Sequence, residues 1–111
     1  MKKTSAAILL ALSILTAGNV ARADALDEKN RAIIAISAYT AQGDMEKLDA
    51  SLVRGLDAGL TVNEIKEVLV QLYAYTGFPR SLNAINRFMD VTKRRAAAGL
   101  GDEAGREASP V

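Results

Sequence analysis

The stretch TVNEIKEVLVQLYAYTGFPRSLNAI, residues 61–85, contains the clearest helix boundaries in the chain. Thr61 and Glu64 have the spacing of a capping box, in which the hydroxyl and the carboxylate each accept from the other residue's backbone N–H. Gly77 suits the left-handed residue that ends a helix, and Pro79 suits the first turn of the next helix because it needs no amide hydrogen there. The stretch therefore predicts two helices joined by a tight corner.

The first of these helices carries apolar residues on two faces. At about 100° per residue, one face gathers Ile65, Leu69, Leu72 and Thr76, with Val68 close by. Val70 and Ala74 occupy the back of the helix, where a solvated helix usually carries charge. We therefore expect one face to pack inside the subunit and the other to pack against another copy of the chain.

A polar ridge borders the core face of the same helix and consists of Glu67, Gln71 and Tyr75. Two interpretations are open. The ridge could line a pocket for a carboxylated or carbonyl substrate. Alternatively, it could be an ordinary helix border in which Tyr75 buries its ring and leaves its hydroxyl in water.

The helix that follows Pro79 is predicted to be amphipathic. The side expected to face the core carries Leu82, Ile85, Phe88, Met89 and Ala96. The polar side carries Asn83, Arg87, Asp90 and Arg94. Residues 97–111 are rich in alanine, glycine and charge and have little apolar surface to bury, so they are predicted to form a disordered tail.

Two further helices are predicted upstream. The first contains NRAIIAISAYTA, residues 30–41, with Asp27 as its N-cap and Gly43 at its end. The second begins after Asp44 and ends before Gly59. Its apolar stripe is Met45, Leu48, Leu52 and Leu56. Short connections favour antiparallel neighbours, so the expected fold class is all-α, a small antiparallel bundle of about four helices.

Residues 1–23 have the pattern of a cleavable signal peptide. Two lysines precede an apolar run of thirteen residues, and Ala21-Arg22-Ala23 forms a small-x-small cleavage site. The run is shorter than the roughly 20 residues that cross a membrane. We therefore predict cleavage after Ala23, a periplasmic or secreted protein with no membrane association, and a folded domain over residues 24–96. A retained N-terminal anchor is the alternative.

The mature chain would be one small domain. At 88 residues its core alone would give marginal stability, and the sequence has no cysteine for disulfides, so assembly of several copies is the expected support. The whole chain has 14 basic and 13 acidic residues; without the signal peptide these become 11 and 13, a net charge of about −2. This mildly acidic composition argues against nucleic-acid binding.

Residues 55–85 resemble a conserved phrase of the carboxymuconolactone decarboxylase family, which includes the alkylhydroperoxidase D-like proteins. The matching positions are Ala58-Gly59-Leu60-Thr61, Glu64-Ile65, Glu67-Val68-Leu69, Gln71, Tyr75-Thr76-Gly77-Phe78-Pro79 and Leu82-Asn83-Ala84. Upstream, residues 30–56 are similar to the family's first two helices. The resemblance implies an all-α subunit that assembles into trimers or hexamers.

The resemblance also implies that familiar chemistry is missing. Redox members use a glutamate, a Cys-x-x-Cys pair and a histidine, and the matching positions here are Ala32, Asp44, Lys47 and Ser51. Thiol peroxidase activity needs a nucleophilic sulfur, so we do not expect it. Decarboxylase members typically keep a histidine where Ser51 stands, and this chain contains no histidine.

The remaining candidates come mostly from the matching segment. Decarboxylation needs a proton donor and a group that accommodates developing negative charge. The predicted catalytic residues are Glu67, Tyr75 and Ser51. The predicted substrate-binding residues are Gln71, Asn83 and Arg80. Further candidates for a carboxylate clamp are Arg31, Arg54 and Arg87. No cofactor is expected.

Two charged clusters have simpler explanations than a site. Asp44, Glu46 and Asp49 could suggest a metal, but acids at a helix start complement the helix dipole, and no metal is predicted. The run Lys93-Arg94-Arg95 could bind an anionic surface, but cations near a helix end are favoured by the same dipole.

The sequence thus predicts an exported helical homo-oligomer similar to carboxymuconolactone decarboxylases. Its activity would be cysteine-independent lyase or decarboxylase chemistry on, or binding of, a small carboxylated or lactone-like molecule. The alternative is a non-catalytic helical oligomer that keeps the scaffold in a structural or binding role.

Overall fold

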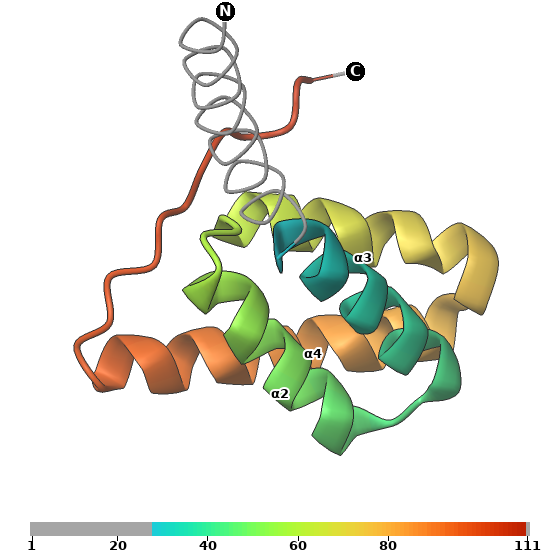
Figure 1. Cartoon of the computed structure of the whole chain (residues 1–111). Coiled ribbons are helices and arrows are strands. Elements are labelled where there is room, and N and C mark those ends of the chain that lie inside the picture. The colour runs from blue at the N-terminus through green and yellow to red at the C-terminus, as the bar shows by residue number, and fades with distance from the viewer. Residues whose placement is uncertain (1–27, 111) are drawn as a thin grey trace, which may run out of the picture.

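A computed structural model describes residues 28–110 (Figure 1). This part of the chain forms four helices and no strand. The first helix is described over residues 28–42 and is followed by α2 (Met45–Asp57), α3 (Val62–Thr76) and α4 (Phe78–Ala97). The predicted all-α fold is therefore confirmed. The predicted signal peptide and the Asp27 cap lie outside the described residues.

Where the structure describes them, the helix boundaries agree with those that the sequence predicts. Thr61 Oγ1 accepts from the Glu64 N–H at 3.2 Å, and Glu64 Oε1 accepts from the Thr61 N–H at 3.2 Å, which completes the capping box. Asp44 Oδ1 caps α2 by accepting from the Lys47 N–H at 3.1 Å. Gly77 has φ +86°, the left-handed region that favours glycine, and separates α3 from α4.

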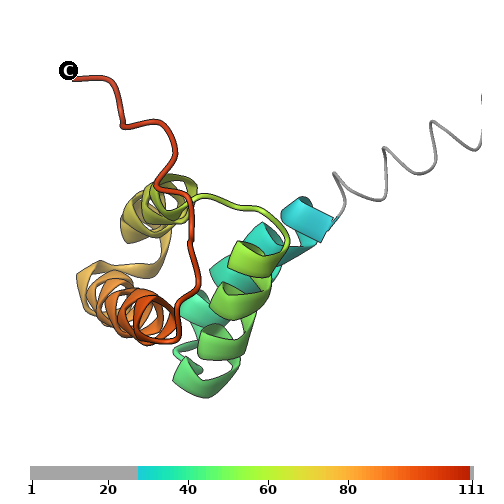
Figure 2. The same ribbon diagram turned by 90° about the vertical axis from the view of Figure 1, so that its left-hand side faces the viewer.

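The helices form two antiparallel pairs that cross each other. Figures 1 and 2 show the first helix beside α2 in one pair and α3 beside α4 in the other. α4 packs against both α2 and α3, so it joins the two pairs. No helix within residues 28–110 has the length and apolarity needed to cross a membrane.

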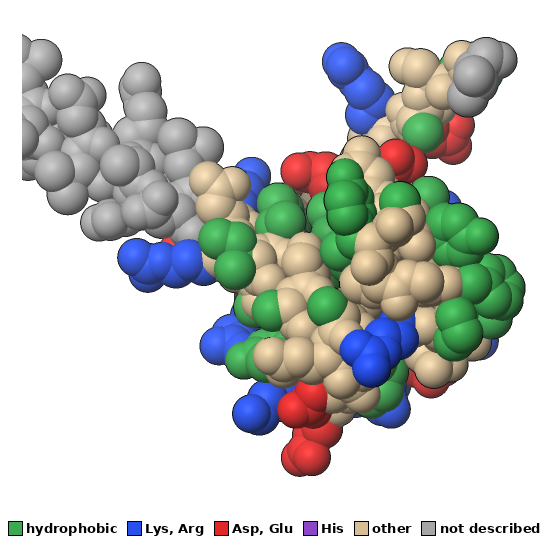
Figure 3. Space-filling model, turned by 90° about the vertical axis from the view of Figure 1, so that its right-hand side faces the viewer, with side chains coloured by type: hydrophobic (Ala, Val, Ile, Leu, Met, Phe, Trp, Pro, Cys, Tyr) green, Lys and Arg blue, Asp and Glu red, His purple; other side chains and the backbone are tan. Residues whose placement is uncertain are grey.

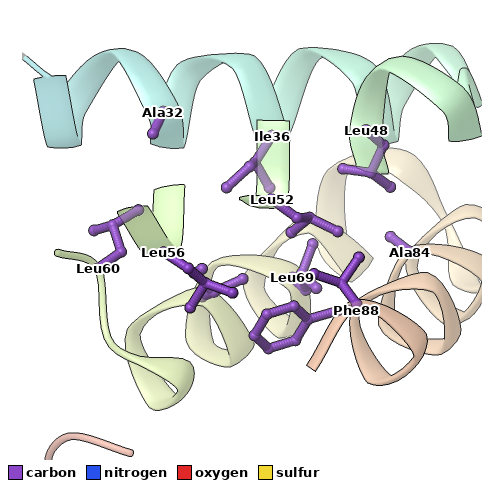
Figure 4. Close-up of a cluster of buried hydrophobic side chains, with 11 residues drawn as sticks. Ala32, Ile36, Leu48, Leu52, Leu56, Leu60, Leu69, Ala84 and Phe88 are labelled. Atoms are coloured by element: carbon purple, nitrogen blue, oxygen red, sulfur yellow. The ribbon is translucent and has the colours of Figure 1, made fainter. Parts of the chain in front are cut away.

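The core lies where the two pairs cross (Figure 4). Its residues are Ala32, Ile36, Leu48, Leu52, Leu56, Leu60, Ile65, Leu69, Ala84, Phe88 and Val91. The apolar stripe predicted for α2 is confirmed at its Leu48, Leu52 and Leu56 positions. Gly55, on the same helix, approaches the first helix closely, because a Cβ there would lie 3.3 Å from Ile36 Cδ1 and 3.6 Å from Ala32 Cβ.

The predicted core face of α4 is confirmed for Phe88, which is buried, and for Ile85, which is partly buried against the core. The rest of the predicted face is wrong by a rotation of about one residue, and Ala96 is exposed. Leu82 and Met89 are 41% and 50% exposed, whereas Ser81 and Ala84 are buried beside Phe88 and Val91. The buried Ser81 hydroxyl is satisfied because its Oγ donates to the Leu69 carbonyl at 2.9 Å. Small side chains at positions 81 and 84 let α4 pack closely against its neighbouring helices. A prediction based on large apolar residues does not detect such small buried positions.

The predicted core face of α3 is confirmed for Ile65 and Leu69, which are fully buried. Val70 on the opposite face is 56% exposed. It belongs to a surface that we call the α3–α4 face, formed by Val70, Tyr73, Phe78, Leu82 and Met89, all of them exposed. Figure 3 shows hydrophobic side chains, in green, gathered along the right-hand side of that view.

The tail differs from the disordered segment that the sequence predicts. Residues 101–110 form no helix or strand, but Glu103 and Ala104 accept backbone hydrogen bonds from the start of α3, and Asp102 pairs with Arg95. Polar contacts, rather than apolar burial, hold this segment, and a hydrophobic pattern does not indicate such contacts.

Candidate functional site

A pocket of about 400 Å³ opens between the first helix and α2. Its lining residues are Glu28, Arg31, Ala32, Ala35, Ser51, Arg54, Asp57 and Ala58. We call it the Ser51 pocket. The three alanines make part of the wall apolar. The four charged side chains can attract an ion of opposite charge.

Ser51 and Ala32 are the buried residues of this lining, and Ser51 is the polar one. Its side chain is 1% exposed, and its Oγ donates to the Leu48 carbonyl at 2.8 Å, three residues back in α2. The hydroxyl hydrogen is therefore already used within the helix. The oxygen lone pairs can still accept a hydrogen bond from a ligand.

Arg31 and Arg54 supply positive charge from opposite helices of the pocket. Both residues are exposed. Among the side chains that the structure describes, neither has a carboxylate within ion-pair distance. Arg54 also lies in the last turn of α2, where the helix dipole favours a cation.

Asp57 at the end of α2 is held by Arg95 of α4. Arg95 Nη2 lies 3.0 Å from Asp57 Oδ1, and the same guanidinium donates to both carboxylate oxygens of Asp102 at 2.8 Å. The hydrogen bond with Asp102 raises the pKa of Arg95 above its ordinary value, and the hydrogen bond from Arg95 lowers the pKa of Asp102. This cluster ties the pocket to the C-terminal tail.

Of the six residues predicted as catalytic or substrate-binding, only Ser51 lies in this pocket. Glu67, Gln71, Asn83 and Arg80 are exposed and are not among its lining residues. Tyr75 is 86% exposed, so within this subunit it neither lines a pocket nor buries its ring. A single subunit therefore does not bring the polar ridge of α3 together with Ser51.

Two of the predicted carboxylate clamps, Arg31 and Arg54, do line the pocket, and Arg87 does not. Arg87 lies 3.7 Å from Asp49, which also pairs with Arg94. The sequence did not predict Glu28, Asp57 or the three alanines as lining residues. A detectable signal was present, because small and charged residues recur at helical spacing around Ser51 on α2 and around Ala32 on the first helix.

The charged clusters are accounted for by local structure. Asp44 caps α2, and Asp49 pairs with arginines of α4. Over the described residues, no three acidic side chains gather in a way that could hold a metal ion. Two apolar grooves of about 310 and 290 Å³ lie elsewhere, along α3 and α4, and share Val70 and Ile85.

Two crossed helical pairs, with a pocket between the helices of the first pair, define a small all-α domain. The chain belongs to the carboxymuconolactone decarboxylase family, whose family model matches residues 7–88. The match begins inside the segment predicted to be a signal peptide.

An uncharacterized protein of Methanocaldococcus jannaschii, MJ1511, is 26% identical over 66 residues. The aligned segment covers 60% of this chain and 62% of that protein, so the chain spans less than two thirds of its relative's length. No solved structure matches the chain.

Proposed function

We propose that the protein binds a small organic carboxylate or lactone acid in the Ser51 pocket. The observation that carries the proposal is the pair Arg31 and Arg54, which line one pocket from two helices without a carboxylate partner among the described residues. A guanidinium matches a carboxylate in shape and charge and can donate two parallel hydrogen bonds to it.

The other lining residues suit the carbon skeleton and the hydroxyl groups of such a ligand. Ala32, Ala35 and Ala58 offer apolar contact to a short carbon skeleton. The Ser51 oxygen and the Glu28 carboxylate can accept hydrogen bonds from a ligand hydroxyl. Asp57 is already neutralised in part by Arg95, so it repels an incoming anion less than a free carboxylate would.

We further propose that the protein catalyses a carboxy-lyase reaction on the bound acid in this pocket. Loss of carbon dioxide leaves an electron pair on carbon, and a donor must then supply a proton. With no histidine or cysteine in the chain, that donor would be the acid form of Glu28 or the Ser51 hydroxyl. Glu67 and Tyr75 could take part only if another copy of the chain brought them to the pocket.

A binding role without turnover is the second candidate, and one observation favours it. The Ser51 hydroxyl hydrogen is donated to the Leu48 carbonyl at 2.8 Å, so the buried hydroxyl of the pocket is not free to donate a proton. Binding requires only the two arginines, whereas decarboxylation requires a donor as well.

The test measures binding and turnover separately. Wild-type protein is titrated calorimetrically with carboxymuconolactone and related lactone acids, and carbon dioxide release is followed with the same compounds. Because a hydrogen bond to a charged group contributes more than a neutral one, Arg31→Gln or Arg54→Gln should each weaken binding by about ten-fold. Lys93→Gln removes one positive charge from an exposed site on α4 outside the pocket and serves as the control.

The outcomes separate the two candidates. Binding with carbon dioxide release supports the lyase, and binding without release supports the binding role. If wild-type protein binds none of these acids, or if the control variant weakens binding as much as the arginine variants, the proposal is wrong.

We also propose that the protein is exported and assembles with copies of itself. The pattern of residues 1–23 supports export, and intact-mass measurement of protein from the cell envelope should show a chain that begins at Asp24. The exposed α3–α4 face supports assembly, because a contiguous apolar surface on a small domain commonly marks an interface.

A further inference from the structure

The tail completes the cap at the start of α3. A helix leaves its first backbone N–H groups without partners inside the helix. Here the capping box satisfies the N–H groups of Thr61 and Glu64. The two N–H groups between them, of Val62 and Asn63, donate to the carbonyls of Glu103 and Ala104, both at 2.9 Å. The start of α3 is thus built from two segments far apart in the sequence.

Gly105 fixes how the tail sits on α3. Its carbonyl accepts from Asn63 Nδ2 at 3.1 Å, and its φ is +80°, in the region that favours glycine. A Cβ at this position would collide with the side chain of Thr61. Only glycine therefore lets the tail approach so closely. We call residues 102–105 the strap; in Figure 2 the red tail runs from the end of α4 past the start of α3.

The strap also reaches the Ser51 pocket through one arginine. Asp102, its first residue, receives two hydrogen bonds of 2.8 Å from Arg95. The same guanidinium contacts Asp57 at 3.0 Å, and Asp57 lines the pocket. Arg95 and Asp102 are both mostly buried, so water screens their interaction less than it would on an open surface.

The charges in this cluster determine whether docking of the strap favours or disfavours an anion in the Ser51 pocket. With the strap docked, one guanidinium lies between two carboxylates, and the cluster has a net charge of −1. When Asp102 leaves, the Arg95–Asp57 pair that remains is neutral. An anion in the pocket therefore meets less repulsion when the strap is released.

We propose that the strap regulates the Ser51 pocket, with Arg95 as the positioning residue that couples them. Docking of the strap weakens anion binding, and a bound anion loosens the strap by the same factor, because coupling between two binding equilibria is reciprocal. This inference rests on the proposed function, since it requires an anionic ligand in the pocket.

Two variants of the full chain release the strap by different means. Asp102→Asn removes the carboxylate, and Gly105→Ala prevents close approach while keeping every charge. Both should bind carboxymuconolactone about two- to five-fold more tightly than wild type, the effect of removing one unit charge at a distance in a partly screened medium. Glu107→Gln removes the same charge from the tail outside the strap and should bind like wild type.

Amide hydrogen exchange measures docking of the strap directly and needs no ligand. The Val62 and Asn63 amides should exchange faster in both strap variants than in wild type, while the Leu52 and Leu69 amides of the core remain protected. In wild type, saturation with carboxymuconolactone should also speed exchange of the Val62 and Asn63 amides. A strap with a purely structural role would not respond to the ligand.

The results distinguish the two levels of the proposal. If wild-type protein binds no lactone acid, the proposed function fails and the coupling fails with it. If wild-type protein binds but both strap variants bind equally well, or if ligand leaves exchange at Val62 and Asn63 unchanged, the coupling alone is overturned.

Discussion

Ser81 Oγ donates a hydrogen bond to the backbone carbonyl of Leu69 at 2.9 Å, and this bond joins α4 to α3 inside the core. Because Ser81 is buried, its hydroxyl cannot form a hydrogen bond with water instead. Because a buried hydrogen bond contributes on the order of 1 kcal/mol net, Ser81→Ala should lower the free energy of unfolding by about that amount. Urea unfolding followed by circular dichroism measures the change.

A second variant at the same position tests packing rather than hydrogen bonding. Ser81→Val adds volume at a buried contact between the two helices and should cost about 1–3 kcal/mol. If the valine variant were as stable as wild type, the close contact of α3 and α4 at this point would be wrong.

Gly55 is predicted to be required for the contact between α2 and the first helix. A Cβ there would lie 3.1 Å from Leu60 Cδ1 and 3.3 Å from Ile36 Cδ1, and both side chains are buried. Alanine would gain up to about 1 kcal/mol in helix propensity, but overpacking costs about 1–3 kcal/mol. We therefore expect Gly55→Ala to be destabilising by about 1 kcal/mol. Gly101→Ala, with no atom within 4 Å, is the control and should leave stability unchanged.

The α3–α4 face is predicted to be covered by another copy of the chain. Val70 is 56% exposed at the point that the two apolar grooves share. Val70→Lys places a charge in that interface and should convert the wild-type oligomer to a smaller species in multi-angle light scattering at micromolar concentration. Asn86→Lys, on an exposed position of α4 outside both grooves, should leave the mass unchanged. A monomeric wild-type protein would contradict the prediction.

Acid should release the strap. The hydrogen bond from Arg95 lowers the pKa of Asp102 in the folded chain. A carboxyl whose pKa is lowered by folding stabilises the folded form above its unfolded pKa and loses that contribution as the pH falls through the folded value. Protection of the Val62 and Asn63 amides should therefore be constant near neutral pH and decline below about pH 4.

Hydrogen exchange corrected for its intrinsic pH dependence measures this decline. Asp102→Asn is the matched comparison, because it lacks the titrating group and should show weak protection at every pH. An identical pH dependence in wild type and variant would show that Asp102 is not the group that releases the strap.

Local signals predicted the fold because each helix boundary depends on neighbouring residues. The capping box of Thr61 and Glu64 and the left-handed Gly77 could be read directly from spacing. The rotation of α4 could not, because burial of Ser81 depends on the Leu69 carbonyl of another helix. Large side chains such as Met89 were expected inside, but small ones permit the closest approach.

The candidate site was predicted less completely for a related reason. Ser51, Arg31 and Arg54 were identified, but the residues that share a pocket with them depend on how the first helix packs beside α2. The polar ridge of α3 illustrates the limit: Glu67, Gln71 and Tyr75 are all exposed, and none of them lines the Ser51 pocket in the subunit. The role of Asp57 as a link to the tail could not be recognised without knowing that Arg95 of α4 contacts it.

The fit of Gly105 against Thr61 has a consequence for how the C-terminal part of this chain can change in length. Residues 98–101 are exposed and look like a connection that would tolerate an insertion or deletion. Deleting one residue there would bring Arg106 to the place of Gly105, and inserting one would bring Ala104, in each case with a side chain where none fits. We therefore expect the sequence of this connection to vary, except at Gly99, whose φ of +81° favours glycine, while its length stays constant.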